Sequence, residues 1–371
     1  MTNSRIWETF SALTSIDSPS FKERAFCDEL KIRLASLGIK VFEDDAGMKI
    51  GGSCGNLYGF LPGSLPLEPL LFSAHLDTVE PGISKKAVLG EDNMITSDGT
   101  TVLGADDVAG ITAILEALTL LKEQNIPHRP IELLFPVAEE RYGLGSAVAD
   151  YSRIKSKECY TLDLGGAIGE AANAAPTLLS FEIIVKGKAA HAGFSPKDGI
   201  HAIHAASKAV ARLPLGEPAP GVTLNVGKIS GGEATNIVPA LCTVSGEIRS
   251  LFHSAVLEQW QQVESIFLEE AENIGAVVKS NCRFEIIAFE TSLESSVANR
   301  FMRACKKVGL TANIHSTLGG SDQNNFAQHG IEGLVLACSM HDVHSTREFC
   351  RLNEMERCAE LVLSLMTEDV I

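Results

Sequence analysis

Short apolar runs alternate with longer helix-like stretches over the first half of the chain. Runs such as LLFSA at 70–74 and IELLFPVA at 131–138 are bounded by polar or glycine-rich segments, which is typical of buried strands. The stretch DVAGITAILEALTLLKEQ at 107–124 has the length of a helix. From residue 5 to about residue 180, this alternation predicts an α/β domain with a largely parallel sheet.

The pattern changes near Leu179, where strand-like and helix-like stretches follow in the order β-α-β-β-α-β. This order is typical of a ferredoxin-like, split βαβ domain of the α+β class. The expected strands are 181–187, 222–229, 240–250 and 282–289, and the expected helices are 199–213 and 254–275.

The α/β pattern resumes after about Glu290. Two helices and one strand are expected there, at 295–309, 353–366 and 333–339. At 371 residues the chain is too long for one ordinary core. We therefore expect residues 1–178 and 291–371 to fold together as one α/β domain, with 179–290 inserted as a second domain.

Composition narrows the classes of function. Lys and Arg number 31 against 47 for Asp and Glu, a formal net charge of -16, which argues against nucleic acid as a partner. The start, MTNSRIWETFSALTSIDS, lacks the basic and apolar parts of a signal peptide, and no later segment has the ~20 uninterrupted apolar residues of a membrane span. Nine cysteines without CxxC spacing favour reduced, buried thiols. We expect a cytoplasmic protein without membrane contact.

Side chains that can bind metals follow four of the apolar runs. In open α/β sheets, ligands bind beyond the carboxyl ends of parallel strands, so four strand ends can deliver one site. The residues are His75, Asp77, Glu139, Glu140, Asp163 and His344.

Two pairs of residues, one of them not yet named, have competing interpretations. His75 and Asp77 are two positions apart, so their side chains point to one face, which suits a ligand imidazole held by a carboxylate, although a polar strand end would look the same. Asp106 and Asp107 open the helix-like stretch. They could cap that helix in the favourable field of its dipole, or one could bridge two cations while the other caps.

The remaining candidates are equally open when taken singly. Glu139 and Glu140 could be a solvated loop, or one could bind a metal while its neighbour is a general base. Asp163 precedes two glycines that allow close approach of a ligand, yet it could be a turn residue. His344 could be a surface histidine, with His341 as its rival for a ligand role.

The types of side chain nevertheless point to one chemistry. Imidazoles and carboxylates without thiolate favour zinc, cobalt or manganese. The set is large enough for two metals that share Asp106. The reaction expected of such a site is hydrolysis of a carbonyl or phosphoryl group.

A series of motifs carries a resemblance to a known family. The motifs are SAHLDTV, LGADDVAG, EERYGLGS, LDLGG, HAGFSPKDG, GGEATNIVPA, GEIRS, GGSDQNNF and VHSTREF. Between His75 and Phe349 the chain resembles the two-zinc metallopeptidases that include peptidase T, carboxypeptidase G and aminoacylase-1, and it is most similar to the peptidase T-like branch. The resemblance implies a catalytic α/β domain, an inserted lid domain and a homodimer formed through that lid.

The resemblance also implies roles for the strand-end residues. The first zinc ion would be bound by His75, Asp106 and Asp163, and the second by Asp106, Glu140 and His344. Asp77 would orient an imidazole ligand. Glu139 would act as general base and acid, taking a proton from a water held between the zinc ions and passing it to the leaving nitrogen.

Substrate contacts are implied as well. His191 would polarise the scissile carbonyl, in dimeric members within the active site of the partner subunit, while Asn236 and Arg249 would hold polar groups or a carboxylate of the substrate. From the residues alone, a core or surface histidine and a surface arginine are the favoured interpretations. The implied substrate loop is Gly319, Gly320, Ser321 and Asp322, whose glycine amides could form an anion cradle at a helix start.

The expected function is therefore that of a zinc-dependent aminopeptidase for short peptides, in particular tripeptides. The same motifs allow an N-acyl amino acid amidohydrolase or a carboxypeptidase, because Arg249 and the substrate loop would serve either substrate. A noncatalytic metal-binding protein on this fold is a third alternative, which loss of Glu139 would have favoured. Val108 stands where many relatives have a lysine, a difference that bears on substrate preference.

Overall fold

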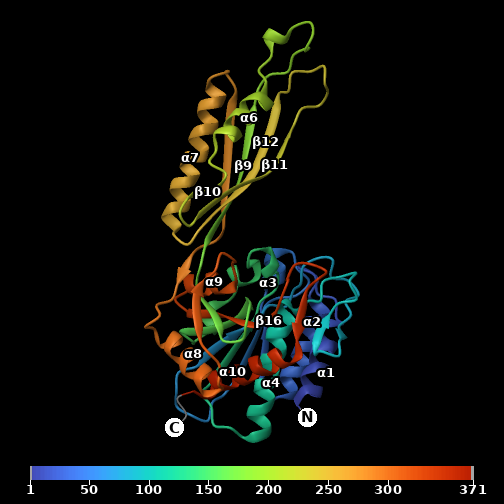
Figure 1. Cartoon of the computed structure of the whole chain (residues 1–371), viewed down its shortest axis with the longest axis vertical. Coiled ribbons are helices and arrows are strands. Elements are labelled where there is room, and N and C mark those ends of the chain that lie inside the picture. Colours follow the sequence, from blue (N-terminus) through green and yellow to red (C-terminus); the bar gives the residue numbers. More distant parts are fainter. Residues whose placement is uncertain (1, 369–371) are drawn as a thin grey trace. The chain divides into compact units, whose positions relative to one another are not determined.

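The computed structural model describes residues 2–368 and consists of two compact units (Figure 1). The first unit comprises the chain up to Ala174 together with the chain from Glu290 onward, and the second comprises Ala175–Phe289. The second unit is thus inserted into the sequence of the first. Within the described part of the chain, no helix is both long enough and apolar enough to cross a membrane.

A nine-stranded mixed sheet forms the centre of the first unit, in the order β1-β2-β6-β3-β7-β16-β8-β14, with β15 beside β8. The four middle strands are parallel: β6 (Ile131–Phe135), β3 (Leu70–Ser73), β7 (Glu158–Gly165) and β16 (Glu332–Met340). Every residue of β3 and β6 is buried, which explains their continuous apolar runs, because a strand covered on both faces has no solvated side. The expected α/β class is confirmed, with antiparallel strands added beside the parallel centre.

The other elements of the sheet and its neighbours are short. The remaining strands are β1 (Lys40–Glu43), β2 (Leu57–Leu61), β8 (Glu170–Ala175), β14 (Phe289–Glu290) and β15 (Asn313–Ser316). A separate antiparallel sheet contains β4 (Val88–Leu89), β5 (Met94–Thr96) and β17 (Phe349–Arg351).

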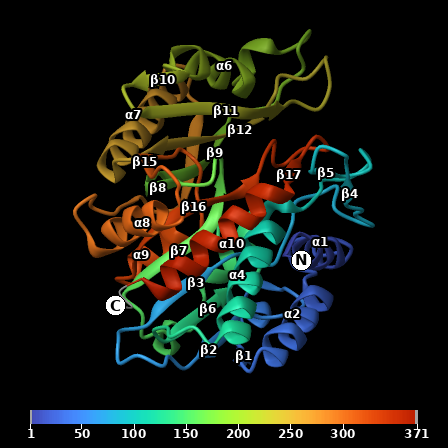
Figure 2. The ribbon, with the colours of Figure 1, turned by 60° about the horizontal axis from the view of Figure 1, so that its bottom comes forward.

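Helices cover the sheet of the first unit. Helix α4 (Ala105–Gln124) packs against α10 (Leu352–Thr367), and both contact β16 (Figure 2). Helix α1 (Thr2–Thr14) packs on both of them, so α4 is enclosed on nearly all sides and its sequence is apolar around most of its circumference. The other helices are α2 (Arg24–Ser36), α3 (Ala46–Ile50), α5 (Leu144–Ala147), α8 (Ser296–Lys307) and α9 (Asp322–Gln328), with 3₁₀ turns η1 (Glu139–Arg141) and η2 (Tyr151–Arg153).

The second unit has its own sheet and its own core. Its strands are β9 (Thr177–Lys186), β10 (Gly216–Ala219), β11 (Val222–Gly231), β12 (Leu241–Ser250) and β13 (Val277–Ile286), in the order β10-β11-β12-β9-β13. The order β11-β12-β9-β13 is that of the expected ferredoxin-like arrangement. Helices α6 (Ala202–Arg212) and α7 (His253–Glu272) pack on β9 and β12 and close the core.

The structure differs from the expectations at one strand and at one cysteine. The last strand was expected at 282–289, but β13 begins at Val277. The sequence pattern missed this start because the first half of β13 is mostly exposed at the sheet edge and contains no long apolar run. All nine cysteines are free thiols, and eight are buried as expected. Cys282, on β13, is exposed.

Candidate metal centre

The four parallel strands deliver the candidate residues to one edge of the sheet. His75 follows β3, and Glu139 and Glu140 follow β6. Asp163 lies near the end of β7, and His344 follows β16. Because these strands are neighbours and run the same way, their carboxyl ends lie together.

His75, Asp106 and Asp163 form the first group of possible metal ligands. Each offers one ligand atom, and these atoms lie within 4.8 Å of one another. Nε2 of His75 is 2.9 Å from Oδ1 of Asp106 and 4.0 Å from Oδ1 of Asp163. Nδ1 of His75 donates to the main-chain oxygen of Asp77 at 2.9 Å, which leaves the Nε2 lone pair for a metal.

Asp106, Glu140 and His344 form the second group. Nε2 of His344 is 3.3 Å from Oδ2 of Asp106 and 3.0 Å from Oε2 of Glu140. The two carboxylate oxygens of Asp106 therefore face different groups. Two ligand atoms bound tetrahedrally to one zinc ion are about 3.3–3.6 Å apart. The four distances from the imidazole nitrogens, 2.9–4.0 Å, lie on either side of this value.

Carboxylates crowd the site and outnumber the two imidazoles that face them. Burial, and then the charges of Glu139 and Asp106, raises the pKa of Asp163 well above its ordinary value. Burial likewise raises the pKa of Glu139, with Asp322 and Glu140 adding to the effect. Oε1 of Glu140 is buried without a hydrogen-bond partner among the described residues, which is expected of an atom that binds a metal. The residues present therefore fit two divalent cations.

Asp107 lies beside the first group but has a different task from the expected one. Its Oδ2 accepts the main-chain N–H of His75 at 3.1 Å, and its Oδ1 accepts the thiol of Cys338 at 3.7 Å. The backbone at Asp106 and Asp107 is not helical, so the regular turns of α4 begin after them. Helix capping was one interpretation of the aspartate pair; in the structure, Asp107 instead anchors the chain at the end of β3.

Asp77 is fully buried and holds the turn that carries the two glutamates. Its Oδ1 accepts the N–H of Glu139 at 2.8 Å, and its Oδ2 accepts the N–H of Glu140 at 3.2 Å and the hydroxyl of Ser20 at 2.7 Å. Its carboxylate is 3.5 Å from Nδ1 of His75, whose closer partner is the main-chain oxygen of Asp77. Asp77 thus orients the imidazole mainly through its main chain and positions the glutamates through its side chain.

Comparison with known proteins gives the family. The model of peptidase family M28 matches residues 56–177, and the peptidase dimerisation domain of the M20 group matches residues 173–275. YqjE of Bacillus subtilis strain 168, an uncharacterized protein, is 36% identical over 364 residues and 98% of each chain. Aminopeptidase PepT of Bacillus cereus is 36% identical in its crystal structure, which covers 100% of this chain and 99% of its own with a TM-score of 0.93. A tripeptidase of Staphylococcus aureus is 31% identical, with 98% of each chain covered and a TM-score of 0.95.

The chain belongs to the peptidase T-like M20 metallopeptidases. The family resemblance read from the motifs is thereby confirmed.

Glu348 is a buried residue of this M20 peptidase that sequence reasoning missed, although it lies within one of the motifs. Glu348 accepts the N–H of Gly104 at 2.7 Å and the N–H of Asp106 at 3.0 Å, and burial raises its pKa to about 7. It therefore fixes the turn that presents the shared ligand Asp106. The signal was available, since Glu348 lies in the VHSTREF motif four residues after His344.

The second unit of the M20 peptidase carries three of the expected substrate residues. Nδ1 of His191 accepts the N–H groups of Gly193 and Phe194, each at 3.1 Å, so its proton lies on Nε2, which can donate to an oxyanion. Asn236 is exposed, and its main-chain oxygen accepts the N–H of Ala192 at 2.9 Å, which joins the two loops. Arg249 lies on β12, where its Nε donates to Glu247 at 2.8 Å. The two metal groups belong to the first unit.

The expected substrate loop lies at the start of α9 in the first unit. Gly319 and Gly320 are exposed, whereas Ser321 and Asp322 are buried. Ser321 and Asn324 form a capping box, in which the N–H of Ser321 donates to Asn324 at 3.1 Å. Asp322 accepts the hydroxyl of Ser146, and burial raises its pKa to about 7. The amides of this short helix are thus partly engaged, and Asp322 adds negative charge near Glu139, which does not favour an anion there.

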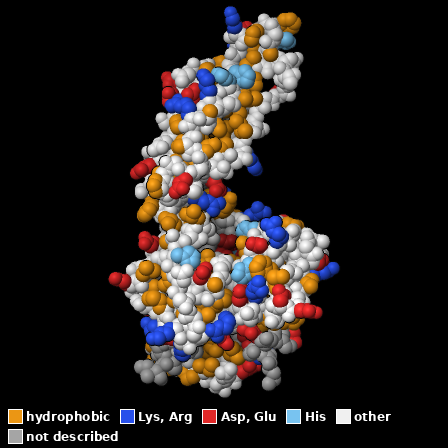
Figure 3. Space-filling model, viewed as in Figure 1, with side chains coloured by type: hydrophobic (Ala, Val, Ile, Leu, Met, Phe, Trp, Pro, Cys, Tyr) orange, Lys and Arg blue, Asp and Glu red, His pale blue; other side chains and the backbone are white. Residues whose placement is uncertain are grey.

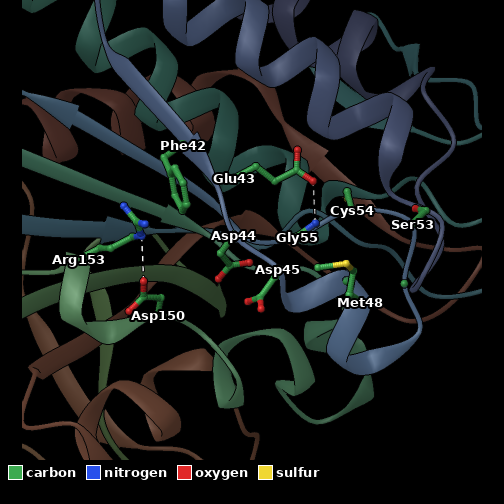
Figure 4. A pocket seen from close by; sticks show the side chains of 12 residues that line it. Phe42, Glu43, Asp44, Asp45, Met48, Ser53, Cys54, Gly55, Asp150 and Arg153 are labelled. Atoms are coloured by element: carbon green, nitrogen blue, oxygen red, sulfur yellow. Dashed lines mark hydrogen bonds and ion pairs between the residues drawn. The ribbon is translucent and has the colours of Figure 1, made fainter.

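A separate cavity of about 560 Å³ lies beside β1 and α3 (Figure 4). Its acidic lining residues are engaged with the protein: Glu43 with Arg24 and Lys31, Asp44 with Asn56 and Tyr58, Asp45 with Lys49, and Asp150 with Arg153. No member of either metal group lines this cavity. Its acids therefore support the local structure, and the candidate metal centre is elsewhere.

The shared ligand gives a test by metal stoichiometry. Asp106→Asn should weaken binding in both groups, whereas His75→Ala and His344→Ala should each affect one, because only Asp106 faces both. Elemental analysis after equilibrium dialysis against zinc should find two ions on the parent chain, about one on each histidine variant and less than one on Asp106→Asn. Asp150→Asn, outside both groups, is the control and should keep two. An Asp106→Asn chain that retains two tightly bound ions would contradict the shared site.

Proposed function

We propose that this chain is a tripeptide aminopeptidase that uses two divalent metal ions and Glu139 to hydrolyse the first peptide bond of short peptides. The observation that carries the proposal is the position of Asp106, whose two oxygens lie 2.9 Å from His75 and 3.3 Å from His344 in two separate ligand groups. The aminopeptidase and the tripeptidase to which the chain is similar over nearly its whole length support this substrate class.

The metal ions would be held by the residues of the two groups, with zinc as the proposed metal and cobalt or manganese as alternatives. The ligands would be His75, Asp106 and Asp163 for one ion, and Asp106, Glu140 and His344 for the other. When bound, such ions supply Lewis acidity, which polarises a scissile carbonyl and acidifies the attacking water.

Glu139 would move the proton. Glu139 belongs to neither ligand group, but its N–H is held by Asp77 and its neighbour Glu140 belongs to the second group, which supports a place for its carboxylate beside the reacting atoms. Glu139 would accept a proton from the attacking water and deliver it to the leaving nitrogen. Asp77 would hold both glutamates and His75 in position during this transfer.

Residues of the second unit and of the α9 loop would bind the substrate. We assign His191 to the oxyanion because its proton lies on the outward Nε2. Arg249 and Asn236 would bind the carboxylate and amide groups of the peptide. In the α9 loop, the exposed backbone of Gly319 and Gly320 would approach the peptide, with Ser321 and Asp322 supporting the loop from within. Val108, buried on α4, takes the place of the lysine in many relatives.

A homodimer formed through the second unit is part of the proposal. The peptidase dimerisation domain matches most of this unit, and hydrophobic side chains are exposed along it (Figure 3). The large exposed ones include Leu241, Phe252, Leu268 and Val277. Sedimentation velocity of the intact chain should give the mass of a dimer. A strict monomer would overturn the dimer and place any role of His191 within one subunit. A cytoplasmic location is also proposed, supported by nine free thiols.

The general base is tested by a variant that keeps its shape. Glu139→Gln should lower kcat for tripeptides by about 10²–10⁴-fold, because an amide cannot accept the proton, and it should keep both metal ions. Glu140→Gln is the matched comparison, since it should lose an ion from the second group. Activity assays paired with metal analysis distinguish the two roles. Undiminished hydrolysis by Glu139→Gln would contradict the role of Glu139 as general base.

The substrate end that is recognised is tested with matched peptides. An aminopeptidase should cleave a tripeptide with a free N-terminus and leave its N-acetylated form intact, because the free amine is part of the recognised group. Preference for the acetylated form would favour the N-acyl amidohydrolase instead. No turnover across a broad peptide library, with two metal ions bound, would favour the noncatalytic alternative.

A further inference from the structure

The segment Ser18–Glu23, which precedes α2, is bound to the turns of the metal centre. Its sequence, SPSFKE, places Ser20 and Glu23 at the spacing of a helix capping box. In the structure α2 begins at Arg24 without a side-chain capping hydrogen bond, and the hydroxyl of Ser20 donates to Asp77 at 2.7 Å. The main-chain oxygen of Ser18 accepts the N–H of Thr78 at 2.9 Å. A motif typical of a helix start is therefore used to hold the site.

Glu23 is fully buried and contacts the main chain just before the proposed general base. Its Oε1 accepts the N–H of Ala138 at 3.1 Å and that of Phe21 at 2.8 Å. Its Oε2 is buried and has no hydrogen-bond partner among the described residues. Ala138 has a φ of 51°, in the left-handed region that alanine rarely adopts. The hydrogen bond from Ala138 to Glu23 thus stabilises a turn conformation that the residue itself does not favour.

Asp77 continues the same support along the turn. The N–H groups of Glu139 and Glu140 donate to Asp77, so three consecutive main-chain donors, from Ala138 to Glu140, are bound by two buried carboxylates. Glu140 is also tied to the second ligand group. If Ala138 lost its acceptor and relaxed to a right-handed conformation, Glu139 would move relative to Glu140.

We propose that Glu23 is a positioning residue of the active site, whose Oε1 holds Ala138 in the left-handed conformation and thereby places the carboxylate of Glu139 for proton transfer. The inference rests on the proposed function of Glu139. Glu23 belongs to neither ligand group and lies behind the turn, so it acts through Ala138 and not on the substrate.

The role requires an acceptor oxygen and no charge. Both hydrogen bonds of Glu23 use Oε1, and Oε2 contributes none. Burial, and then the charge of Asp77, raises the pKa of Glu23 to about 7, so a neutral side chain is compatible with this place. Glutamine can put its amide oxygen where Oε1 lies. Methionine has a similar length but offers no comparable acceptor.

These properties define a pair of variants. Glu23→Gln should keep kcat for a tripeptide within about 3-fold of the parent, because the acceptor is retained. Glu23→Met should lower kcat by about 10–100-fold with KM changed by less than about 3-fold and with two metal ions still bound, since the general base is displaced while substrate contacts remain. Glu23→Leu is a second apolar variant in case the methionine variant does not fold.

Glu132 provides a matched control in the same unit. It is also a buried glutamate, and it accepts the main-chain N–H groups of Lys155 and Ser156 at 2.9–3.1 Å, away from the metal groups. Glu132→Met should lower the unfolding temperature as Glu23→Met does but leave kcat unchanged. Equal losses of kcat in the two methionine variants would assign the effect to general destabilisation and overturn the inference.

A readout that does not need activity separates this inference from the proposed function. Hydrogen exchange of the peptide covering 137–142 should become faster in Glu23→Met and remain slow in Glu23→Gln, because only the first loses the acceptor of Ala138. Unchanged exchange in Glu23→Met, or equal kcat losses in the glutamine and methionine variants, would overturn the positioning role. A parent chain that cleaves no peptide would overturn the proposed function and its proton transfer, whereas the exchange data would still decide whether Glu23 holds the turn.

Discussion

Repulsion among carboxylates at low dielectric is the constraint on which the first unit depends. Asp106, Asp163, Glu139 and Glu140 lie together at the carboxyl edge of the parallel strands, and burial raises the pKa of three of them. A chain can hold such a cluster only if opposite charge neutralises it and if the backbone is fixed against the repulsion. The imidazoles of the two groups lower the pKa of Asp106 against the effect of burial, and two divalent ions would neutralise the rest.

The backbone is fixed by carboxylates that come from distant parts of the sequence. Asp107 holds the N–H of His75, Asp77 holds those of Glu139 and Glu140, and Glu348 holds that of Asp106. Four residues near the proposed chemistry are therefore supported through their main chains by acids from other segments. The main chain is thus held without using the side-chain atoms that face the two ligand groups. Glu23 extends the same principle to Ala138.

The second unit is organised differently, around an antiparallel sheet and a core of its own. Its expected substrate residues lie on exposed loops and on one strand. The local hydrogen bonds of His191 set its tautomer, in which Nε2–H can donate a hydrogen bond to an oxyanion. The proposed reaction thus uses residues of the first unit, and part of the proposed substrate recognition uses residues of the second.

Much of this protein could be predicted from the sequence, because buried strands and helices leave periodic apolar patterns and because side chains at strand ends follow directly in the chain. The four strands, their polar ends and the motif series were readable for that reason. The start of β13 was missed because an exposed edge strand carries no apolar run. The tasks of Asp107 and Glu23 were not readable, since a hydrogen bond between a side chain and a distant main-chain N–H leaves no pattern in the sequence. Glu348 stood in a motif, but its task was not readable for the same reason. The sequence alone determined the elements and the kinds of ligand they carry; the tertiary structure alone decided which of the other carboxylates hold the backbone of the site, because that task depends on contacts between segments far apart in the chain.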